Sequence, residues 1–463
     1  MGKNVLAYII VLLLLFIILF YVVSYPTKNV YNGYAHYENN SSANGQKIIR
    51  LNANPFQYQF EGNSSHVYVL NGSISSFNLS LPSLNAVNSS VLAPISYYNN
   101  QIFIPLSSNS MGINLSKYWG GLAAVNATNG NFIWVDYFNN QIMTQPLVFN
   151  GIAYIGLGAA FYNPDKDTNG VIAVNATNGK IVWTRYMDSE HMPTFVYYND
   201  TLVVTPGLGM PIDNSSGVLY FLNATSGKTI KEINTSSESA MSSILVVNDT
   251  AYFGAALFNF SSNSPIYQNN FKNAFYAIDL KNESILWSDK FNSSFGMQDS
   301  SPVFSNGLVM TGYSSSLFNN TISILGLNYS NGKMVWNFTS PERGNRSSPY
   351  IQLPPLTSYD GVLYSDSPTI GMLYALNASN GDLLWQFYTG PSVANVNVFN
   401  GSLLILNSQG YLFSINLNGK LLDKLYMGVP SGPENLVVIG NKLVVYGNSN
   451  KVIVLTLPLV NGT

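Results

Sequence analysis

The few side chains in this sequence that could do chemistry gather in short segments that precede apolar runs. The chain has 463 residues, of which 22 are Asp or Glu, 20 are Lys or Arg and 3 are His. Against that low background these segments carry His191, Asp299, Arg343 and Arg346. If they converge, a carboxylate, an imidazole and two guanidiniums could bind an anion or another polar ligand. The alternative interpretation is that they are solvated loop charges.

The two arginines decide which ligand we expect. Two cations together would repel a divalent metal ion but attract a carboxylate or another anion. His191 would add to that attraction when it is protonated at low pH. The four residues therefore predict an anion site and no metal site.

Other chemistries find little support. The chain has no cysteine, which excludes disulfides, thiolate chemistry and Cys-ligated metals. His36, His66 and His191 have no metal-ligand spacing. Two Gly-x-Gly segments, 156–158 and 207–209, follow apolar runs but open no helix, so they fail as nucleotide loops. The net charge of −2 argues against nucleic-acid binding, which needs a basic face.

A sequence repeat defines the elements that must position these segments. The unit Val125-Asn-Ala-Thr-Asn-Gly-Asn-Phe-Ile-Trp134 returns at 174–183, 327–336 and 376–385, and in degenerate form at 222–231, 278–287 and 415–423. Each unit holds four short β patterns, and Asn-Gly between alternating apolar runs is a strong hairpin signal. We therefore predict an all-β, eight-bladed β-propeller of four-stranded antiparallel blades, an architecture also built from WD40-like and YVTN-like repeats. The eight leading polar positions are Asn78, Asn126, Asn175, Asn223, Asp279, Asn328, Asn377 and Asn416.

In that architecture the charged segments enter the innermost strands near the central funnel. The ring must also close, because an open ring leaves aggregation-prone edges. We expect the strands in 437–457 to pair with strands near 48–60.

The repeat residues themselves have structural roles. The leading Asn can accept a hydrogen bond from the backbone two residues on, and the glycine supplies a positive φ. The tryptophan would pack between blades. The structural set comprises Trp134, Trp183, Trp287, Trp336, Trp385, Gly130, Gly179, Gly227, Gly332, Gly381 and Gly419.

These residues resemble the pyrroloquinoline-quinone repeat, Ala-x-Asp-x-x-Thr-Gly-Lys-x-x-Trp, over roughly residues 60 to 457. The resemblance implies the quinoprotein alcohol dehydrogenase-like β-propeller family, which contains both enzymes that use the quinone with calcium or a lanthanide and non-enzymatic scaffolds. The enzymes' metal ligands, catalytic Asp and vicinal disulfide find no matching motif here. We therefore expect no cofactor, with the quinone and calcium as the alternative. Asn replaces the family's Asp in every copy except Asp279, which indicates either a fold insensitive to external acid or compositional drift.

The N-terminal residues predict a membrane anchor. Val5–Val23 is an unbroken apolar run of 19 residues, which as a helix reaches about 28 Å and can span a bilayer. A cleaved signal peptide is the alternative, but the run is long and bulky residues occupy the cleavage position. The predicted organisation is a transmembrane anchor over 1–25, a linker over 26–45 and the propeller over 46–463. Lys3 favours a cytoplasmic N-terminus and an extracytoplasmic propeller.

Many Asn-x-Ser/Thr sequons accompany this predicted location, and a chain rich in Asn and Ser also produces them by chance. Loop and linker sequons, at Asn39, Asn63, Asn214 and Asn292, are the expected glycosylation sites. Sequons in the tight turns would lose their local hydrogen bond to a glycan.

Two functions remain open. The favoured one is a single-pass, membrane-bound propeller that scaffolds or binds a surface protein or polysaccharide without catalysis. The alternative is a divergent quinone-dependent dehydrogenase. The only other partner we expect is membrane lipid around the N-terminal helix.

Overall fold

The computed structural model describes most of the chain after residue 56, with gaps. Within the described part no helix is long and apolar enough to cross a bilayer. The predicted span Val5–Val23 and the linker lie outside it, so both stay predictions. The described residues are 57–58, 69–70, 73–84, 87–108, 119–142, 144–158, 170–187, 194–205, 218–235, 243–257, 272–291, 301–313, 323–340, 356–367, 370–392, 396–430 and 436–457.

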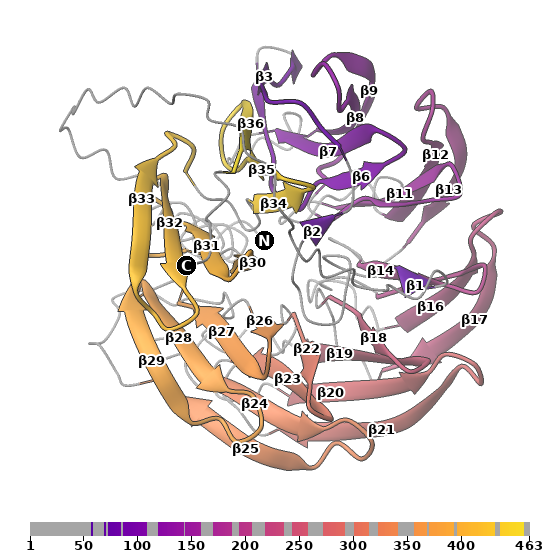
Figure 1. The fold of residues 1–463 in the computed structure, drawn as a ribbon. Helices are drawn as coiled ribbons and strands as arrows, with labels where there is room; N and C mark the ends of the chain where they lie inside the picture. Colours follow the sequence, from indigo (N-terminus) through magenta and orange to yellow (C-terminus); the bar gives the residue numbers. More distant parts are fainter. Residues whose placement is uncertain are drawn as a thin grey trace, which may run out of the picture.

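The described strands form eight sheets set radially around a central axis, each with four antiparallel blade strands, which confirms the predicted eight-bladed propeller (Figure 1). Within a blade the first strand is innermost and the fourth lies on the rim. Blades 1 to 4 are β6–β9 (Ser96–Tyr98, Gln101–Ser108, Gly120–Asn126, Phe132–Phe138), β10–β13 (Leu147–Phe149, Ile152–Leu157, Gly170–Asn175, Ile181–Tyr186), β14–β17 (Phe195–Tyr198, Thr201–Val204, Val218–Asn223, Thr229–Asn234) and β18–β21 (Leu245–Val247, Thr250–Leu257, Lys272–Asp279, Ser284–Phe291).

Blades 5 to 7 follow the same plan. They are β22–β25 (Val303–Ser305, Leu308–Tyr313, Ser323–Asn328, Met334–Thr339), β26–β29 (Leu356–Tyr359, Val362–Asp366, Met372–Asn377, Leu383–Tyr388) and β30–β33 (Asn397–Phe399, Ser402–Leu406, Tyr411–Asn416, Leu421–Tyr426). The eighth blade takes three strands from the C-terminal end, β34–β36 (Leu436–Ile439, Lys442–Val445, Lys451–Thr456), and its rim strand from the N-terminal side.

That rim strand is β3 (Phe77–Ser80), so strands from both ends of the chain close the ring. Closure by N-terminal pairing was expected, but the segment 48–60 was wrong, because Phe77 pairs with Val454. Asn78 is also not a leading turn residue, since it lies inside β3 opposite Ile453. In the last blade the third and fourth strands come from opposite ends of the chain, so no tight turn joins them. Eight blades therefore form with only seven leading residues in turns.

Two short N-terminal strands extend two of the blades on the side of the axis. Strand β1 (Gln57–Tyr58) pairs with β14 of blade 3, and β2 (Val69–Leu70) pairs in parallel with β34 of blade 8. Both partners are innermost strands, so β1 and β2 add to the edges that face the axis (Figure 1). A further hairpin, β4 (Ser83–Leu84) with β5 (Val87–Ser90), joins β7 in blade 1.

The turn chemistry follows the predicted Asn side chains. Asn126 Oδ1 accepts a hydrogen bond from the backbone N–H of Thr128 at 2.8 Å, and Asn377 Oδ1 accepts one from Ser379 at 2.9 Å. Gly381, at the end of the second of these turns, has a φ of +75°. A left-handed residue of this kind is easiest for glycine. These turns join the third and fourth strands and fix where each rim strand begins.

The hydrophobic core lies between the blades rather than at the axis. One cluster joins Met310 and Trp336 of blade 5 to Leu363 and Tyr374 of blade 6, and another joins blades 8 and 1. Because both faces of a blade pack against neighbours, the second and third strands are buried along most of their length. The rim strands are the half-exposed elements of each blade.

Candidate functional site

The four predicted ligand residues fall on connections of one kind. In the sequence, His191 lies between β13 and β14, Asp299 between β21 and β22, and Arg343 with Arg346 between β25 and β26. Each of these connections leads from a rim strand to the innermost strand of the next blade. Because the strands of a blade are antiparallel, all of them start from the face opposite the tight turns. The four residues lie outside the described part, so their convergence stays a prediction.

The innermost strands of blades 6 to 8 are tied to one another by side-chain hydrogen bonds. The Thr357 hydroxyl of β26 donates to the carbonyl oxygen of Val396 at 2.7 Å. Asn397 Nδ2 of β30 donates to the carbonyl oxygen of Leu436 in β34 at 3.0 Å. Buried hydrogen bonds of this kind fix neighbouring strands in register. They hold β26, the innermost strand that follows the connection with Arg343 and Arg346, firmly against the next blade.

The described residues do not fit the quinone with calcium that the resemblance implies. Calcium takes six to eight oxygen ligands, and within the described part no three His, Cys, Asp or Glu side chains come together. The buried carboxylate found there, Asp366, is already hydrogen-bonded by protein groups. The backbone of β1 and β2 also takes up axis-facing edges of blades 3 and 8.

Asp366 is a chemically unusual group in the described part. It ends β27 with a side chain that is 0 % exposed. The Thr389 hydroxyl donates to Asp366 Oδ2 at 3.1 Å, and the backbone N–H of Ser367 donates to Oδ1 at 2.8 Å. Burial disfavours the charged form and raises the pKa of Asp366 to about 8, against the lowering effect of these two hydrogen bonds. The carboxyl is therefore neutral in acid.

The tryptophans of the repeat join each blade to the next. Trp336 of blade 5 donates from Nε1 to the carbonyl oxygen of Ala378 in blade 6 at 3.1 Å. Its ring lies so close to Gly381 that a Cβ there would be 2.7 Å from Trp336 Cε3. We call this pair a clasp. It recurs as Trp134 with Gly179, Trp183 with Gly227, Trp287 with Gly332 and Trp385 with Gly419, and Phe77 takes the tryptophan's place against Gly130.

The junction between blades 3 and 4 departs from this pattern. Lys231 stands at the tryptophan position of blade 3, and Glu283, with a φ of +49°, stands at the glycine position of blade 4. Lys231 Nζ lies 3.9 Å from Glu283 Oε2 and 3.5 Å from the carbonyl oxygen of Asn282. A polar contact therefore replaces the clasp here, and we call this junction the polar seam.

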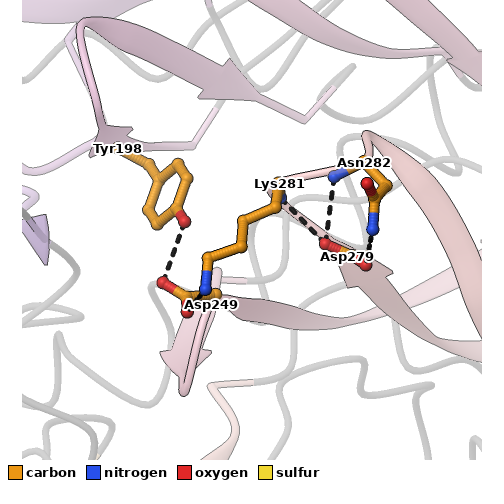
Figure 2. A network of polar contacts seen from close by, with 5 residues as sticks. All are labelled: Tyr198, Asp249, Asp279, Lys281 and Asn282. Carbon is orange, nitrogen blue, oxygen red and sulfur yellow. Dashed lines mark hydrogen bonds and ion pairs between the residues drawn. The ribbon is translucent and has the colours of Figure 1, made fainter.

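Figure 2 shows the rest of the polar seam. The Tyr198 hydroxyl of β14 donates to Asp249 Oδ1 at 2.8 Å, and Lys281 Nζ lies 2.5 Å from Asp249 Oδ2. Asp279 Oδ1 accepts the backbone N–H groups of Lys281 and Asn282 at 2.8 and 3.1 Å. The network thus connects a strand of blade 3 with two turns of blade 4.

These contacts hold the aspartates in their charged form. The hydrogen bond from Lys281, followed by that from Tyr198, lowers the pKa of Asp249. Burial, and then the hydrogen bond to Asp249, raises the pKa of Tyr198 to about 12. Sequence reasoning missed this network, although its signal was present, because the two degenerate repeat copies at 222–231 and 278–287 meet at this junction.

Comparisons with known proteins agree on the fold. Residues 114–316 match the family model described as outer membrane protein assembly factor BamB. A curated relative, the tetrathionate hydrolase of Acidithiobacillus ferrooxidans, is 25 % identical over 350 residues, covering 68 % of this chain. The chain spans 65 % of that relative's length, just under two thirds.

Solved structures extend the likeness to nearly the whole propeller. BamB from Moraxella catarrhalis superposes with a TM-score of 0.56 at 15 % identity, covering 83 % of this chain and 100 % of that one. The quinohemoprotein alcohol dehydrogenase of Comamonas testosteroni gives 0.60 at 11 % identity, covering 90 % and 83 %. A europium-containing methanol dehydrogenase gives 0.60 at 10 % identity, covering 85 % and 90 %. Identities this low establish the fold alone. The matched family model and the repeat residues agree with that fold, so the chain is a β-propeller whose repeats are similar to the pyrroloquinoline-quinone repeat.

Proposed function

We propose that this protein is a membrane-anchored, extracytoplasmic binding module whose propeller takes an anionic ligand or partner on the face opposite the tight turns. The observation that carries the proposal is where the charges fall. Only 9 % of the residues are charged, yet Arg343, Arg346, His191 and Asp299 all lie on connections that start from that one face. Two guanidiniums in fork geometry suit a carboxylate, sulfate or phosphate group.

A binding role also suits the construction of the ring. Side-chain hydrogen bonds tie the innermost strands of blades 6 to 8, and clasps join most blades along the rim. A rigid scaffold that presents variable connections is a common way to build a binding surface. The matched family model is that of an assembly factor, a role that is consistent with a propeller serving as a surface for a protein or polysaccharide partner.

The location rests on the apolar run Val5–Val23 and on Lys3 before it. We expect native protein to stay with membranes through an alkaline carbonate wash and to retain its N-terminus. A mature N-terminus near Tyr25 in native material would contradict the anchor.

The second candidate function is hydrolysis of a sulfur oxyanion of the tetrathionate type. The match to tetrathionate hydrolase over 350 residues favours it, and tetrathionate is an anion of the kind that the two arginines would attract. Both candidates therefore place an anion on the same face. They differ in whether the anion is consumed.

One experiment separates the two candidates. Purified full-length protein in detergent is incubated with tetrathionate at acid and at neutral pH, while ion chromatography follows its concentration and calorimetry its binding. Consumption that is lost in Arg346→Ala supports the hydrolase, and saturable binding without consumption supports the binding module. Lys333→Ala is the matched control, because it removes one cation from a tight turn of the opposite face. Absence of both binding and consumption would contradict the anion site.

A further inference from the structure

The rim strands carry a pattern that the proposed function does not use. All the large hydrophobic side chains that are exposed in the described residues lie on rim strands of blades 1 to 7. The two positions before the tryptophan, or its replacement, are the usual places, as at Leu383 and Leu384 in β29. A rim strand also has an edge that no described strand covers. Unpaired edges of this kind readily pair with another chain.

Most rim strands contain at least one charged residue. Asp136 lies in β9, Arg185 in β13, Lys231 in β17, Lys290 in β21 and Lys424 in β33. Charged side chains on an edge discourage pairing with other chains. Three rim strands, β25, β29 and the short β3, contain no charged residue. Among these three strands, only β25 and β29 carry exposed large hydrophobic side chains.

Strand β29 is the more apolar of these two edges. Its solvent side carries Leu384, Gln386 and Tyr388, of which Leu384 is 51 % and Tyr388 63 % exposed. The corresponding strand β25 ends in Thr339, whose hydroxyl lies 3.3 Å from the Ser323 hydroxyl, and its Asn337 accepts a hydrogen bond from Tyr313. The polar side chains of β25 are therefore already engaged by side chains of its own blade.

We propose that β29 is a homodimer interface, in which the strand pairs antiparallel with β29 of a second copy about a two-fold axis at Gln386. This register sets Leu384 opposite Tyr388 of the partner copy, and each Gln386 opposite the other. The edge is self-complementary, because aliphatic side chains meet aromatic ones and amide meets amide. One isologous contact covers the β29 edges of both copies and leaves no further β29 edge to pair, so the assembly closes as a dimer. The net charge of −2 opposes the approach of two copies only weakly.

The absence of cysteine makes the register directly testable. Directly opposed residues of antiparallel strands have Cα atoms about 4.5–5.5 Å apart, within the range that a disulfide spans. Full-length Gln386→Cys in detergent should therefore form a covalent dimer under mild oxidation. Ser288→Cys is the control, because Ser288 is exposed at the same repeat position of β21, beside the charged Asp289 and Lys290. Equal cross-linking of the two variants would overturn the proposal.

The second arm measures association without a cross-link. Light scattering of the full-length protein across a concentration series should give a dimer of the 463-residue chain. Leu384→Lys replaces the apolar contact with Tyr388 of the partner copy by a cation at each end of the interface and should weaken the dimer at least tenfold. Leu286→Lys is the matched control at the same repeat position of β21, with 54 % exposure, and should leave the dimer intact. A monomeric wild type, a dimer that survives Leu384→Lys, or equal loss in both variants would each refute the β29 interface.

Discussion

Replacement of a clasp glycine should cost more than backbone strain alone. Gly381 and Gly307 both have a φ of +75°, so alanine meets the same left-handed penalty at either position, about 1–2 kcal/mol. They differ in surroundings. A Cβ at Gly307 has no atom within 4 Å, whereas a Cβ at Gly381 would lie 2.7 Å from Trp336 Cε3 and 2.9 Å from Trp336 Cδ2.

The Trp336 ring cannot easily move aside, because it is 6 % exposed and its Nε1 is bonded to the Ala378 carbonyl oxygen. Overpacking of this kind costs about 1–3 kcal/mol. We therefore expect Gly381→Ala to lower the free energy of unfolding by about 1–3 kcal/mol more than Gly307→Ala. Denaturant unfolding followed by tryptophan fluorescence measures the difference from the two midpoints. Equal midpoints for the two variants would refute the clasp as an energetic link between blades.

Three further predictions concern pH and modification. Because the pKa of Asp249 is lower in the folded than in the unfolded protein, its charged form stabilises the fold above the ordinary carboxylate range, and this stability is lost as the pH falls through the folded pKa. Asp249→Asn should therefore make the free energy of unfolding depend less on pH below about pH 4. An unchanged pH dependence in this range would contradict the prediction. Burial raises the pKa of Asp366 to about 8, so its effect on stability has the opposite sign. Between the unfolded and folded pKa of Asp366, the free energy of unfolding of the wild type should fall by about 1.4 kcal/mol per pH unit relative to Asp366→Asn, as measured from denaturant midpoints between about pH 4 and 8. Midpoints that run parallel in the two proteins would exclude a buried neutral acid. Both sequon side chains at Asn126 are held in a tight turn, because Asn126 Oδ1 accepts the Thr128 N–H and the Thr128 hydroxyl accepts a hydrogen bond from Asn100 Nδ2. Glycopeptide mass spectrometry should therefore find Asn126 less occupied than Asn63, and the reverse order would oppose the argument.

Local features were predictable from the sequence, and contacts between distant segments were not. The turns at Asn126 and Asn377 depend on side chains within four residues, so their pattern repeats visibly along the chain. The strand that closes the ring has no such local pattern. Phe77 pairs with Val454, which is far away in the sequence, and the four residues of β3 are too few to show a β pattern. The polar seam likewise depends on Lys231 and Glu283 being neighbours in space.

The predicted ligand residues illustrate a further limit. A low charge content made His191, Asp299, Arg343 and Arg346 conspicuous, but long connections have no periodic pattern from which their approach could be derived. All four lie outside the described residues. Asp366 was not predicted from the sequence, because its burial and its contact with Thr389 arise only when distant segments pack together.

Calorimetric titration of the full-length protein in acid tests most directly whether the propeller binds an anion rather than the quinone. Tetrathionate is titrated in one series, and the quinone with calcium in another. We predict saturable binding of tetrathionate that weakens in Arg346→Ala and as the pH rises through the ordinary histidine range of about 6.5, with no heat from the quinone. Calcium-dependent binding of the quinone that disappears in Asp299→Asn, without any binding of the anion, would contradict the account.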